Sequence, residues 1–399
     1  MTITTAPDIE LMEGTFYAGN PYPAFAWMRE HAPAYYDKGG DIWGITRYAD
    51  VRGIGQDPQT FSSAQGSRPR TPLPYMIDMD APEHRRRRRL VSAGFTPEAV
   101  RIRQPRVREV CDEIIDAVCQ DGACDLVTDI AAPLPLVMIA DMLGFPPHDW
   151  SKLLEWSETM LMSQGPSDDE AFVRAAAAFT EWDAYVRDQI EARRLAGTSD
   201  DLLGTLALAE IDGDRIDDTS LVYESLLLLI GGDETSRHVI SGGMEALLRH
   251  PDQLRDLKAD RDLLPGAVEE MLRWVTPIKN MNRNATRDVE LHGKTIKAGQ
   301  NVLLLYPSAN RDESVFTNPE TFDIRRQPND HVAFGFGAHL CLGHRLARAE
   351  IAGMVDRILD RFDDLSIATD DPLPLRVSNF IVGYEHIPVR FTPTVPTTG

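Results

Sequence analysis

The spacing of apolar residues predicts that most of the chain between residues 83 and 260 is helical. Apolar side chains recur there at the helical period, which places them on one face of each helix. Three segments show this spacing clearly: 103–118, 150–162 and 170–194. The sequences GFPP at 144–147 and GP at 165–166 interrupt the pattern and predict breaks between helices.

The longest segment with a helical pattern runs from about residue 218 to residue 250, where Pro251 ends it. Asp218 and Thr219 are candidate N-caps. At 1.5 Å per residue this helix would be roughly 50 Å long, enough to cross a whole domain. It contains glycine pairs at 231–232 and 242–243, and each glycine costs about 1 kcal/mol relative to alanine.

Short strands are predicted on both sides of the helical region. Residues 21–61 indicate a helix followed by a small sheet around GDIWGITRY, and residues 62–82 indicate a long loop. After Pro277 the pattern predicts three short strands, at 288–291, 295–296 and 301–305. A polar stretch at 307–330, a last helix at 342–362 and a terminal strand region follow. With no repeat and no linker, this order predicts a mostly α fold of the α+β kind, helix-rich with small sheets and one continuous core.

Charge and composition exclude two classes of protein. The 399 residues include 62 acidic and 41 basic side chains, a formal net charge of −21. This balance argues against nucleic-acid binding, which needs a basic face. A hydrophobic content of 43 % and a charged content of 26 % argue against a disordered chain.

No segment has the pattern of a membrane span or of a secretory signal. The longest strongly apolar run noted is residues 226–230, whereas a span needs about 20 residues, and the N-terminus lacks a basic and an apolar signal region. The four cysteines, at 111, 119, 124 and 341, form no C-x-x-C pair. We therefore expect a cytoplasmic protein without a membrane anchor, whose cysteines are buried thiols or ligands.

The strongest local signal surrounds Cys341, in the segment AFGFGAHLCLGHRLARAE at 333–350. A helix N-terminus at this point would stabilise a thiolate, and the glycines let the backbone approach something flat and bulky. Three interpretations are open: a buried cysteine in a tight turn, a zinc site of His339, Cys341 and His344, or an axial thiolate to haem iron. A structural zinc site needs four ligands, and no cysteine pair is present to complete this one. Covalent c-type haem is excluded because C-x-x-C-H is absent.

The spacing Phe334-x-x-Gly337-x-x-x-Cys341-x-Gly343 resembles the haem-binding signature of the cytochrome P-450 family, the haem-thiolate monooxygenases. Four further motifs of that family occur in the right order: His84-x-x-x-Arg88, GGDET at 231–235, Glu270-x-x-Arg273, and ANRD at 309–312 followed by Phe316, Pro319, Phe322-Asp323 and Arg326. The resemblance covers about residue 21 to the end. Because the motifs interleave along the chain, we expect a loose N-terminal lead-in at 1–20 and a single monooxygenase domain at 21–399.

The resemblance implies that haem b is the cofactor and O2 the co-substrate, with Cys341 as the axial ligand of the iron. Three residues would lie around that ligand: Phe334, Gly335 and Gly343. Four would hold the haem propionates, which need donors where they are buried: His84, Arg88, Arg283 and His339. The alternative for the arginine run 85–89 is a solvated basic face, which we accept for most of these arginines.

Two of the motifs also have a physical interpretation of their own. Glu270 and Arg273 are spaced to pair on a helix, and the resemblance adds Arg326 to a structural network that shapes the cysteine loop; alone, such a pair is more often a solvated helix face. The Thr235 hydroxyl can bond the carbonyl of residue 231 and open a groove in the helix, although core packing also favours small residues there. By resemblance, Thr235 and Glu234, with Asp233 as a helper, relay protons to dioxygen at the iron.

Within the family the resemblance is closer to soluble actinobacterial enzymes that oxidise the terminal side-chain methyl of cholesterol and cholest-4-en-3-one. It is carried by MIDMDAPEHRRRRRLVSAGFT, LLLLIGGDETSRH, LLPGAVEEMLRWVTPIKNM and FGFGAHLCLG. We therefore expect hydroxylation of an unactivated C–H bond at the end of a sterol side chain or a branched lipid. The alternatives are a polyketide, macrolide or other secondary-metabolite hydroxylase and, more distantly, a non-catalytic haem sensor. Five segments are expected to face the substrate: 68–76, 160–172, 226–232, 277–281 and 378–382.

The expected partners follow from what the chain lacks. No flavin or iron–sulfur domain is recognisable in it, so electrons are expected from a separate ferredoxin and an NAD(P)H-dependent ferredoxin reductase. Arg345 and Arg348, together with the arginines at 85–89, form a candidate basic patch. An acidic ferredoxin would dock there under electrostatic steering.

Overall fold

The computed structural model describes residues 9–162, 169–211 and 213–397. Its α-helices are α1 (Gly14–Ala18), α2 (Tyr22–His31), α3 (Tyr48–Gln56), α4 (Glu83–Ser92), α5 (Pro97–Val118), α6 (Pro133–Leu143), α7 (Trp150–Met162), α8 (Asp169–Ala196), α9 (Leu202–Leu208), α10 (Asp218–Leu248), α11 (Pro251–Ala259), α12 (Leu264–Val275), α13 (Tyr306–Ala309) and α14 (His344–Arg361). Its strands are β1 (Ala34–Asp37), β2 (Ile42–Ile45), β3 (Phe61–Ser62), β4 (Ala123–Asp125), β5 (Glu210–Ile211), β6 (Asp214–Arg215), β7 (Asn280–Ala285), β8 (Val289–Leu291), β9 (Lys294–Ile296), β10 (Asn301–Leu305), β11 (Asp363–Ile367) and β12 (Pro388–Thr392). The helix-rich α+β class predicted from the sequence is confirmed.

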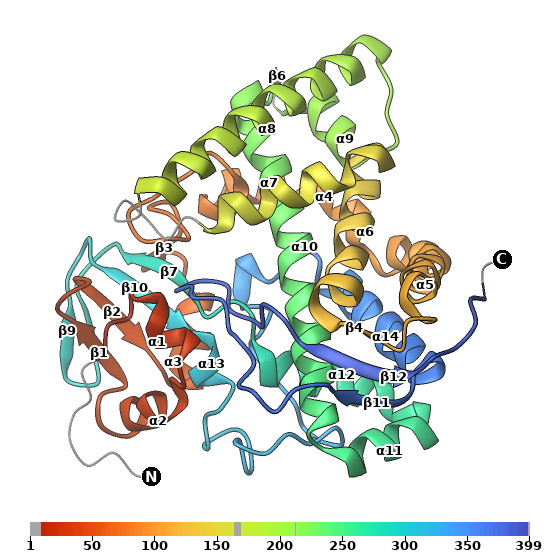
Figure 1. Cartoon of the computed structure of the whole chain (residues 1–399). Coiled ribbons are helices and arrows are strands. Elements are labelled where there is room, and N and C mark those ends of the chain that lie inside the picture. Colours follow the sequence, from red (N-terminus) through yellow and green to blue (C-terminus); the bar gives the residue numbers. More distant parts are fainter. Residues whose placement is uncertain (1–8, 163–168, 212, 398–399) are drawn as a thin grey trace.

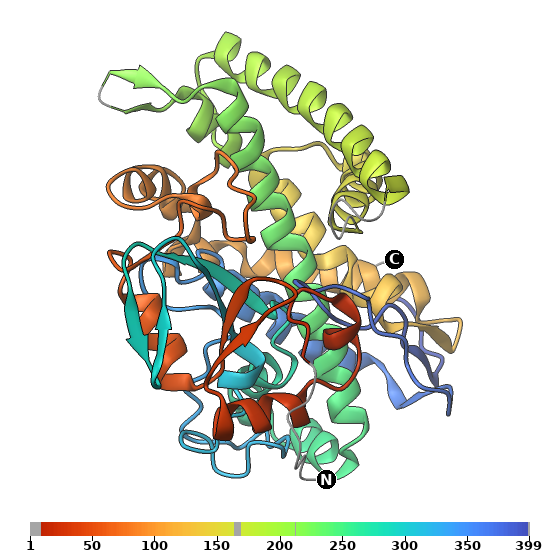
Figure 2. The ribbon, with the colours of Figure 1, turned by 90° about the vertical axis from the view of Figure 1, so that its left-hand side faces the viewer.

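The long helix α10 runs through the middle of the molecule, with the other helices and the small sheets arranged around it (Figures 1 and 2). It packs against α6, α12 and α14. The predicted caps, Asp218 and Thr219, are wrong by one and two residues, because the carboxylate of Asp217 accepts the Ser220 N–H at 2.9 Å. Capping one residue earlier satisfies an N–H group that the helix itself leaves free.

The other predicted helices differ from the structure mainly at their ends. α7 matches its prediction, and α8 and α14 differ by one or two residues at each end. α5 begins at Pro97 rather than at residue 103, because the Thr96 hydroxyl accepts the Ala99 N–H at 3.2 Å and Pro97 suits the first helical position. The predicted break at 165–166 lies outside the described residues.

The largest sheet has the strand order β1-β2-β10-β7-β3. β10 occupies the predicted residues, and β8 and β9 lie within one residue of the predicted short strands and pair with each other in an antiparallel manner. β7 was not predicted, since NMNRNA shows no alternation of apolar and polar residues. It forms through antiparallel pairing with β10 and β3, and this pairing sets Arg283 opposite Val302 inside the sheet.

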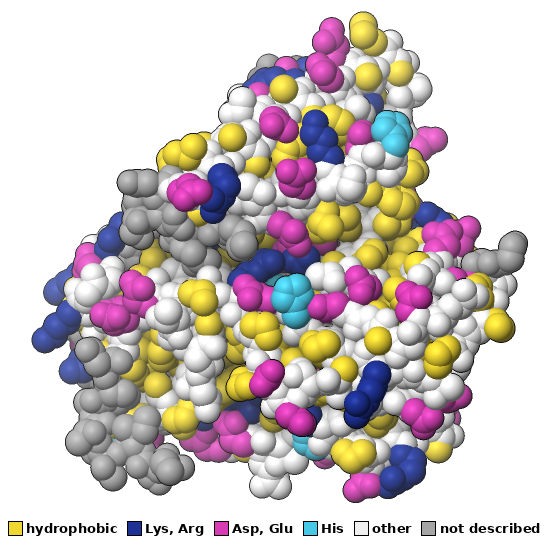
Figure 3. All heavy atoms as spheres, viewed as in Figure 1, with side chains coloured by type: hydrophobic (Ala, Val, Ile, Leu, Met, Phe, Trp, Pro, Cys, Tyr) yellow, Lys and Arg dark blue, Asp and Glu magenta, His cyan; other side chains and the backbone are white. Residues whose placement is uncertain are grey.

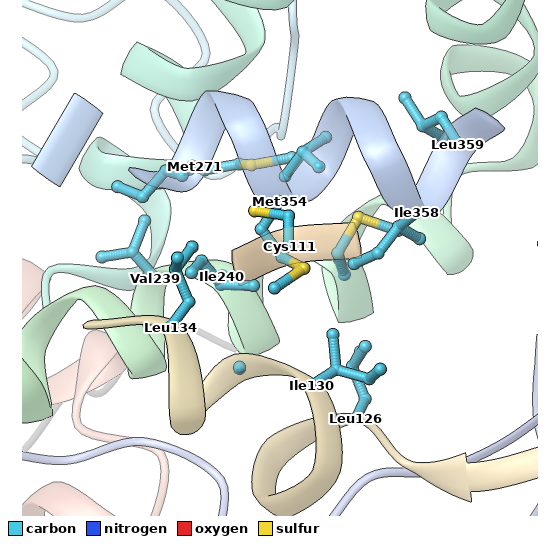
Figure 4. Packing of buried hydrophobic residues seen from close by; sticks show 14 of the residues in the cluster. Cys111, Leu126, Ile130, Leu134, Val239, Ile240, Met271, Met354, Ile358 and Leu359 are labelled. Atoms are coloured by element: carbon cyan, nitrogen blue, oxygen red, sulfur yellow. The ribbon is translucent and has the colours of Figure 1, made fainter. Parts of the chain in front are cut away.

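The main hydrophobic core lies where α5, α6, α10, α12 and α14 meet. Cys111 of α5, Ile240 of α10 and Met354 of α14 converge there from three segments that are far apart in the sequence (Figure 4). A second core joins the first half of α10 to α6, α7, α8 and α9. The cysteine loop before α14 and the middle of α10 are therefore fixed relative to one another by packed helices.

The N-terminal segment is not the loose lead-in that the sequence suggested, as far as residues 9–20 are concerned. Ile9, Leu11 and Tyr17 are buried in a core with α2 and Val382. The Leu11 N–H donates to the Asp37 carboxylate at 2.8 Å, and the Tyr17 hydroxyl donates to the Leu11 carbonyl at 2.9 Å. Burial of these side chains ties the segment down.

One stretch, Leu126–Leu143, is long and apolar enough to span a membrane by length and composition alone. It is a longer apolar stretch than residues 226–230, on which the expectation from sequence relied. In the fold it comprises a π-helical turn (Leu126–Ala131) and α6, and 78 % of it is buried. It packs on α5 and α10, as a core helix does.

Candidate active site

A cavity of about 1400 Å³, open space at its mouth included, lies between the middle of α10 and the loop that precedes α14. The fold brings to it most of the candidate residues from the sequence: His84, Arg88, Thr235, Arg283, Phe334, Gly335, His339, Cys341 and Gly343. They come from α4, α10, β7 and the 333–343 loop. Much of the remaining wall is apolar, with Met76, Ile139, Leu227, Leu228 and Ile278 among its side chains.

The loop that carries Cys341 is held by backbone contacts. Gly335 and Gly337 have φ values of +68° and +73°, which favour glycine, and a Cβ at Gly337 would overlap the carbonyl oxygen of Gly55 in α3. The Cys341 N–H donates to the Phe334 carbonyl at 2.9 Å. Cys341 does not stand at the head of the helix, because α14 begins at His344.

The charge state of the Cys341 sulfur depends on competing effects. Burial raises the pKa of the thiol, while the Gly343 N–H, Arg88 and Arg348 act to lower it. Burial outweighs these groups, so the pKa of the Cys341 thiol is raised in the protein without a bound metal. A bound metal cation reverses such a balance, because a coordinating thiol loses its proton.

The zinc alternative has no support in the fold. No group of three His, Cys, Asp or Glu side chains suited to a metal ion occurs in the described part of the chain. His339 instead stacks against His84, with ring centroids 4.1 Å apart, and its Nε2 lies 3.1 Å from the Ser63 hydroxyl.

Four of the cavity residues form a cluster that we call the cationic edge: His84, Arg88, Arg283 and His339. Arg88 donates to the Leu340 carbonyl at 2.5 Å, and Arg283 donates to the Asn282 carbonyl at 2.7 Å. Neither guanidinium forms an ion pair with a carboxylate within residues 9–162, 169–211 and 213–397. Burial and then the charges of Arg283, His84 and Arg88 lower the pKa of His339 to about 2.

Two arginines and two imidazoles, with no carboxylate in ion-pair contact with the arginines in the described part of the chain, fit a dianionic ligand that is partly buried. The two propionates of haem supply such a charge. The cavity therefore fits haem b. Its wall contains a sulfur, glycines that open the backbone beside that sulfur, and the cationic edge. Cys341 is the residue in this set able to hold the iron, and the cationic edge is the part able to hold the carboxylates.

The predicted groove in α10 is present. The Thr235 hydroxyl donates to the Gly231 carbonyl at 3.0 Å, and a Cβ built on Gly231 would meet no atom within 4 Å. A Cβ on Gly232 would instead press into Ile139 of α6 at 2.8 Å. The first glycine of the pair therefore opens space in the cavity, and the second allows two helices to pack closely.

Asp233 and Glu234 do not line the cavity. The Glu234 carboxylate pairs with Arg237 at 2.5 Å and with Arg376 at 2.8 Å. Burial would raise the pKa of Glu234, but His238, Arg237 and Arg376 hold it well below its ordinary value. Asp233 accepts a hydrogen bond from the Ser157 hydroxyl of α7 at 3.0 Å, and burial together with the charge of Glu234 raises its pKa to about 7.

Glu270, Arg273 and Arg326 form one buried network beneath the cysteine loop. Arg273 pairs with both Glu270 oxygens at 2.7 and 2.8 Å, and Arg326 lies 3.1 Å from Glu270. The remaining donors of Arg273 bind the carbonyls of Asn310, Pro319 and Thr321. The charges and donors of this network are therefore satisfied by the chain itself.

Sequence reasoning missed several residues of the site. Glu350 and Ser236 line the cavity and are joined by a hydrogen bond of 2.9 Å from the Ser236 hydroxyl. Burial raises the pKa of Glu350 to about 8. Arg237, one helical turn after Glu234, could have been found from its i, i+3 spacing. No local signal marks Arg376 or Glu350 as neighbours of these residues.

The segments expected to face the substrate contribute unequally. Met76 lines the cavity, as do Leu227, Leu228, Gly231 and Gly232 from the 226–232 segment and Pro277, Ile278 and Met281 from the 277–281 segment. Residues 378–382 do not line it, nor do the described residues of 160–172; positions 163–168 lie outside the described part of the chain.

The candidate basic patch is smaller than the sequence suggested. Arg87 turns inward to Glu224 of α10 at 3.3 Å, and Arg348 binds Glu269 at 2.6 Å. Arg85, Arg89 and Arg345 are exposed. On the face shown in Figure 3, acidic side chains are scattered among fewer lysines and arginines.

Similarity to known proteins agrees with this geometry. The family profile described as Cytochrome P450 matches residues 148–385. A steroid C26-monooxygenase of Mycolicibacterium smegmatis is 49 % identical over 98 % of this chain and 98 % of its own length. A methyl-branched lipid omega-hydroxylase of Mycobacterium bovis is 37 % identical, covering 92 % and 90 % of the two chains. A crystal structure of a Bacillus megaterium protein in complex with testosterone superposes with a TM-score of 0.87 at 31 % identity, covering 94 % and 98 %.

Proposed function

Because the chain belongs to the cytochrome P450 family and is therefore a haem-thiolate monooxygenase that uses O2, we propose that it hydroxylates the terminal carbon of a sterol side chain or of a methyl-branched lipid. The observation that carries this proposal is the cavity in which Cys341 and the Thr235 groove share one largely apolar chamber. Relatives named for terminal oxidation of steroids and of branched lipids support it over nearly the whole chain.

The site residues expected from the sequence each have a proposed part in this reaction. Haem b, when bound, supplies the activation of dioxygen and the oxidation of the C–H bond. Cys341 holds the iron through its thiolate, and the cationic edge neutralises and orients the two carboxylates. Phe334, Gly335 and Gly343 shape the backbone around the sulfur. The network of Glu270, Arg273 and Arg326 keeps that loop in place.

Proton delivery is assigned to the middle of α10. The Thr235 hydroxyl is bonded to a backbone carbonyl at the cavity wall, so it can pass a proton while its own position stays fixed. Glu234 lies next to it in sequence but is held by two arginines, so its proton exchange requires those ion pairs to loosen. Asp233 is assigned the part of a helper; burial raises its pKa, but its carboxylate is bonded to Ser157 and does not line the cavity, so it acts through neighbouring groups.

Electrons are supplied from outside the chain, as in the family, and we assign this task to a ferredoxin and its NAD(P)H-dependent reductase. Arg85 and Arg345 are exposed, and they form the proposed docking contact for an acidic partner. Reversing both charges to Glu should slow reduction and remove its dependence on salt. Unchanged reduction kinetics in a stopped-flow measurement would rule out this docking surface.

The proposed location is the cytoplasm, where a ferredoxin and reduced nicotinamide cofactors are found together. All four cysteines are unpaired thiols, as expected in a reducing compartment.

A spectral titration tests the substrate class. Purified haem-loaded protein is titrated with cholest-4-en-3-one, with a methyl-branched fatty acid and with a set of macrolides. We expect the sterol or the branched lipid to displace the water on the ferric iron and give the low-spin to high-spin shift, with turnover to a terminally hydroxylated product. A shift and turnover with macrolides alone would favour the polyketide alternative. No turnover with any ligand and competent redox partners would favour a haem sensor.

The part of Thr235 is tested by measuring how many electrons are used per product. Thr235→Ala removes the hydroxyl but leaves the cavity wall otherwise intact, so we expect NAD(P)H to be consumed while product falls and hydrogen peroxide rises. Thr235→Ser keeps a hydroxyl and should retain most of the coupling. Fully retained coupling in Thr235→Ala would remove Thr235 from the mechanism.

A further inference from the structure

Arg348 lies three residues from Arg345 on α14, yet its surroundings differ from those of a docking residue. Its Nε and Nη2 donate to the two carboxylate oxygens of Glu269 in α12 at 2.6 and 2.8 Å. Its Nη1 donates to the His344 carbonyl at 3.0 Å. Each of its nitrogens therefore has a partner inside the molecule, and the side chain is only 34 % exposed.

The same guanidinium covers an aromatic ring of the cysteine loop. Its central carbon lies 4.5 Å from the centroid of the Phe334 ring, a cation–π distance. The rings of His331 and His344 lie 5.9 Å from that ring. The Phe334 ring is thus held between α14 and the loop by planar groups and has little freedom to turn.

Glu269 keeps the guanidinium in this position. It accepts hydrogen bonds from Arg348 and from the buried His331 at 3.1 Å. Burial would raise the pKa of Glu269, but these two partners lower it to about 2. The carboxylate is therefore ionised at neutral pH, and a planar bidentate pair fixes both the position and the tilt of the arginine.

We propose that Glu269, Arg348 and Phe334 form a clamp that positions the Cys341 thiolate and supplies it with positive charge, so that Arg348 is a positioning residue rather than a docking residue. The clamp is linked to Cys341 through the backbone, since the Phe334 carbonyl accepts the Cys341 N–H at 2.9 Å, and the Phe334 ring shares the cavity wall with Cys341. The clamp rests on the proposed role of Cys341 as the iron ligand.

A redox titration separates positioning from docking, because it needs no protein partner. Haem-loaded wild type, Arg348→Met, Arg348→Lys and the control Arg345→Met are titrated with a chemical reductant and mediator dyes. In Arg348→Met a positive charge beside the thiolate is lost, so the equilibrium constant for one-electron reduction should fall about threefold to tenfold, tenfold being 59 mV. Arg348→Lys keeps the charge without the planar fork and should recover part of the loss. Arg345→Met should leave the constant unchanged and slow only reduction by ferredoxin.

A second variant tests the part of Glu269 in the clamp, and it also replaces Arg348→Met if that variant fails to fold. Glu269→Gln removes a negative charge and the bidentate pair, so the equilibrium constant for reduction should rise rather than fall. An unchanged constant in Arg348→Met with full haem content, or an equal change in Arg345→Met, would overturn the clamp. A wild type whose reduced carbon monoxide complex lacks the thiolate-ligated spectrum would instead overturn the proposed function.

Discussion

Two clusters of buried charge serve the same cavity, and they differ in whether the chain balances them. In the network of Glu270, Arg273 and Arg326, each charged group faces an opposite charge or a carbonyl of the protein. In the cationic edge, Arg88 and Arg283 bind only backbone carbonyls, and their charges lower the pKa values of His84 and His339 after burial has done so. The first arrangement is complete without a ligand, whereas the second is stabilised by an anion that the chain does not provide.

This difference separates structural from ligand-binding charge without any appeal to similarity. A buried ion that is hydrogen-bonded on all sides gains little from a further partner. In the cationic edge the charges of Arg88 and Arg283 oppose protonation of His84 and His339, and a bound dianion offsets these charges. By the same criterion Glu234 belongs to the charges that the chain itself balances, since it is paired with Arg237 and Arg376.

The largest effect is expected where the balanced network is broken. Arg273→Met leaves the fully buried Glu270 without its bidentate partner, and removal of one member of a buried pair costs about 3–5 kcal/mol. Against a typical total stability of about 5–15 kcal/mol, we expect a strongly lowered midpoint in urea unfolding and poor haem incorporation. Arg101→Met, which breaks an exposed pair with Glu98, is the control and should change little. Equal effects of the two variants would contradict the comparison.

An intermediate effect is expected where the cationic edge is weakened. Arg283→Met should lower haem affinity about tenfold to 100-fold, because a hydrogen bond to a charged group contributes about 1.5–3 kcal/mol. The haem-free protein should be about as stable as the wild type, since Arg283 forms no ion pair with a carboxylate among the described residues. Haem transfer to an acceptor protein measures the first quantity, and urea unfolding of the haem-free protein measures the second. The exposed Arg287, mutated to Met, is the control; a loss of haem-free stability in Arg283→Met alone would make Arg283 structural.

A pH-dependent effect sharpens the comparison with a third kind of buried group, a carboxyl without a cation. Burial raises the pKa of Glu350 to about 8 from an ordinary value of 4.5. Between these values the folded chain holds a proton that the unfolded chain releases, so the contribution of Glu350 to stability is present below pH 4.5 and is lost as the pH rises to 8. Glu350→Gln should therefore gain more stability relative to the wild type at pH 8 than at pH 5. Unfolding curves at both pH values test this, with the exposed Glu109→Gln as control; a difference that does not depend on pH would contradict it.

The elements that the sequence predicted well are those whose signal is local. The helical period over 150–162 gives α7, and the apolar run that became β10 lies at the predicted residues. β7 could not be predicted in this way, because Asn280, Asn282 and Asn284 have low strand propensity and the strand exists only through its pairing with β10 and β3. The same holds for the N-terminal segment, whose Leu11 and Tyr17 are buried by elements far along the chain.

The residues of the candidate site likewise divide into those with a local signal in the sequence and those without one. The spacing from Phe334 to Gly343 and the Thr235–Gly231 hydrogen bond within one helix follow from positions a few residues apart. The inward turn of Arg87 and the pairing of Arg348 with Glu269 do not, because in each case the partner lies on another helix. The sequence shows that a residue is charged, but its orientation and its partner depend on which residues the fold places beside it.

The sequence by itself determined the helices, the cysteine loop and the set of residues that could serve a haem-thiolate site, because periodicity, glycine positions and motif spacing act over short distances. Only the tertiary structure decided which charges are balanced and which are left for a ligand. Glu234 pairs with Arg376, Glu350 is bonded to Ser236, and the charge of Arg283 acts on His339, in each case between segments distant in the chain. Burial and charge compensation are properties of that assembly, so no local pattern records them.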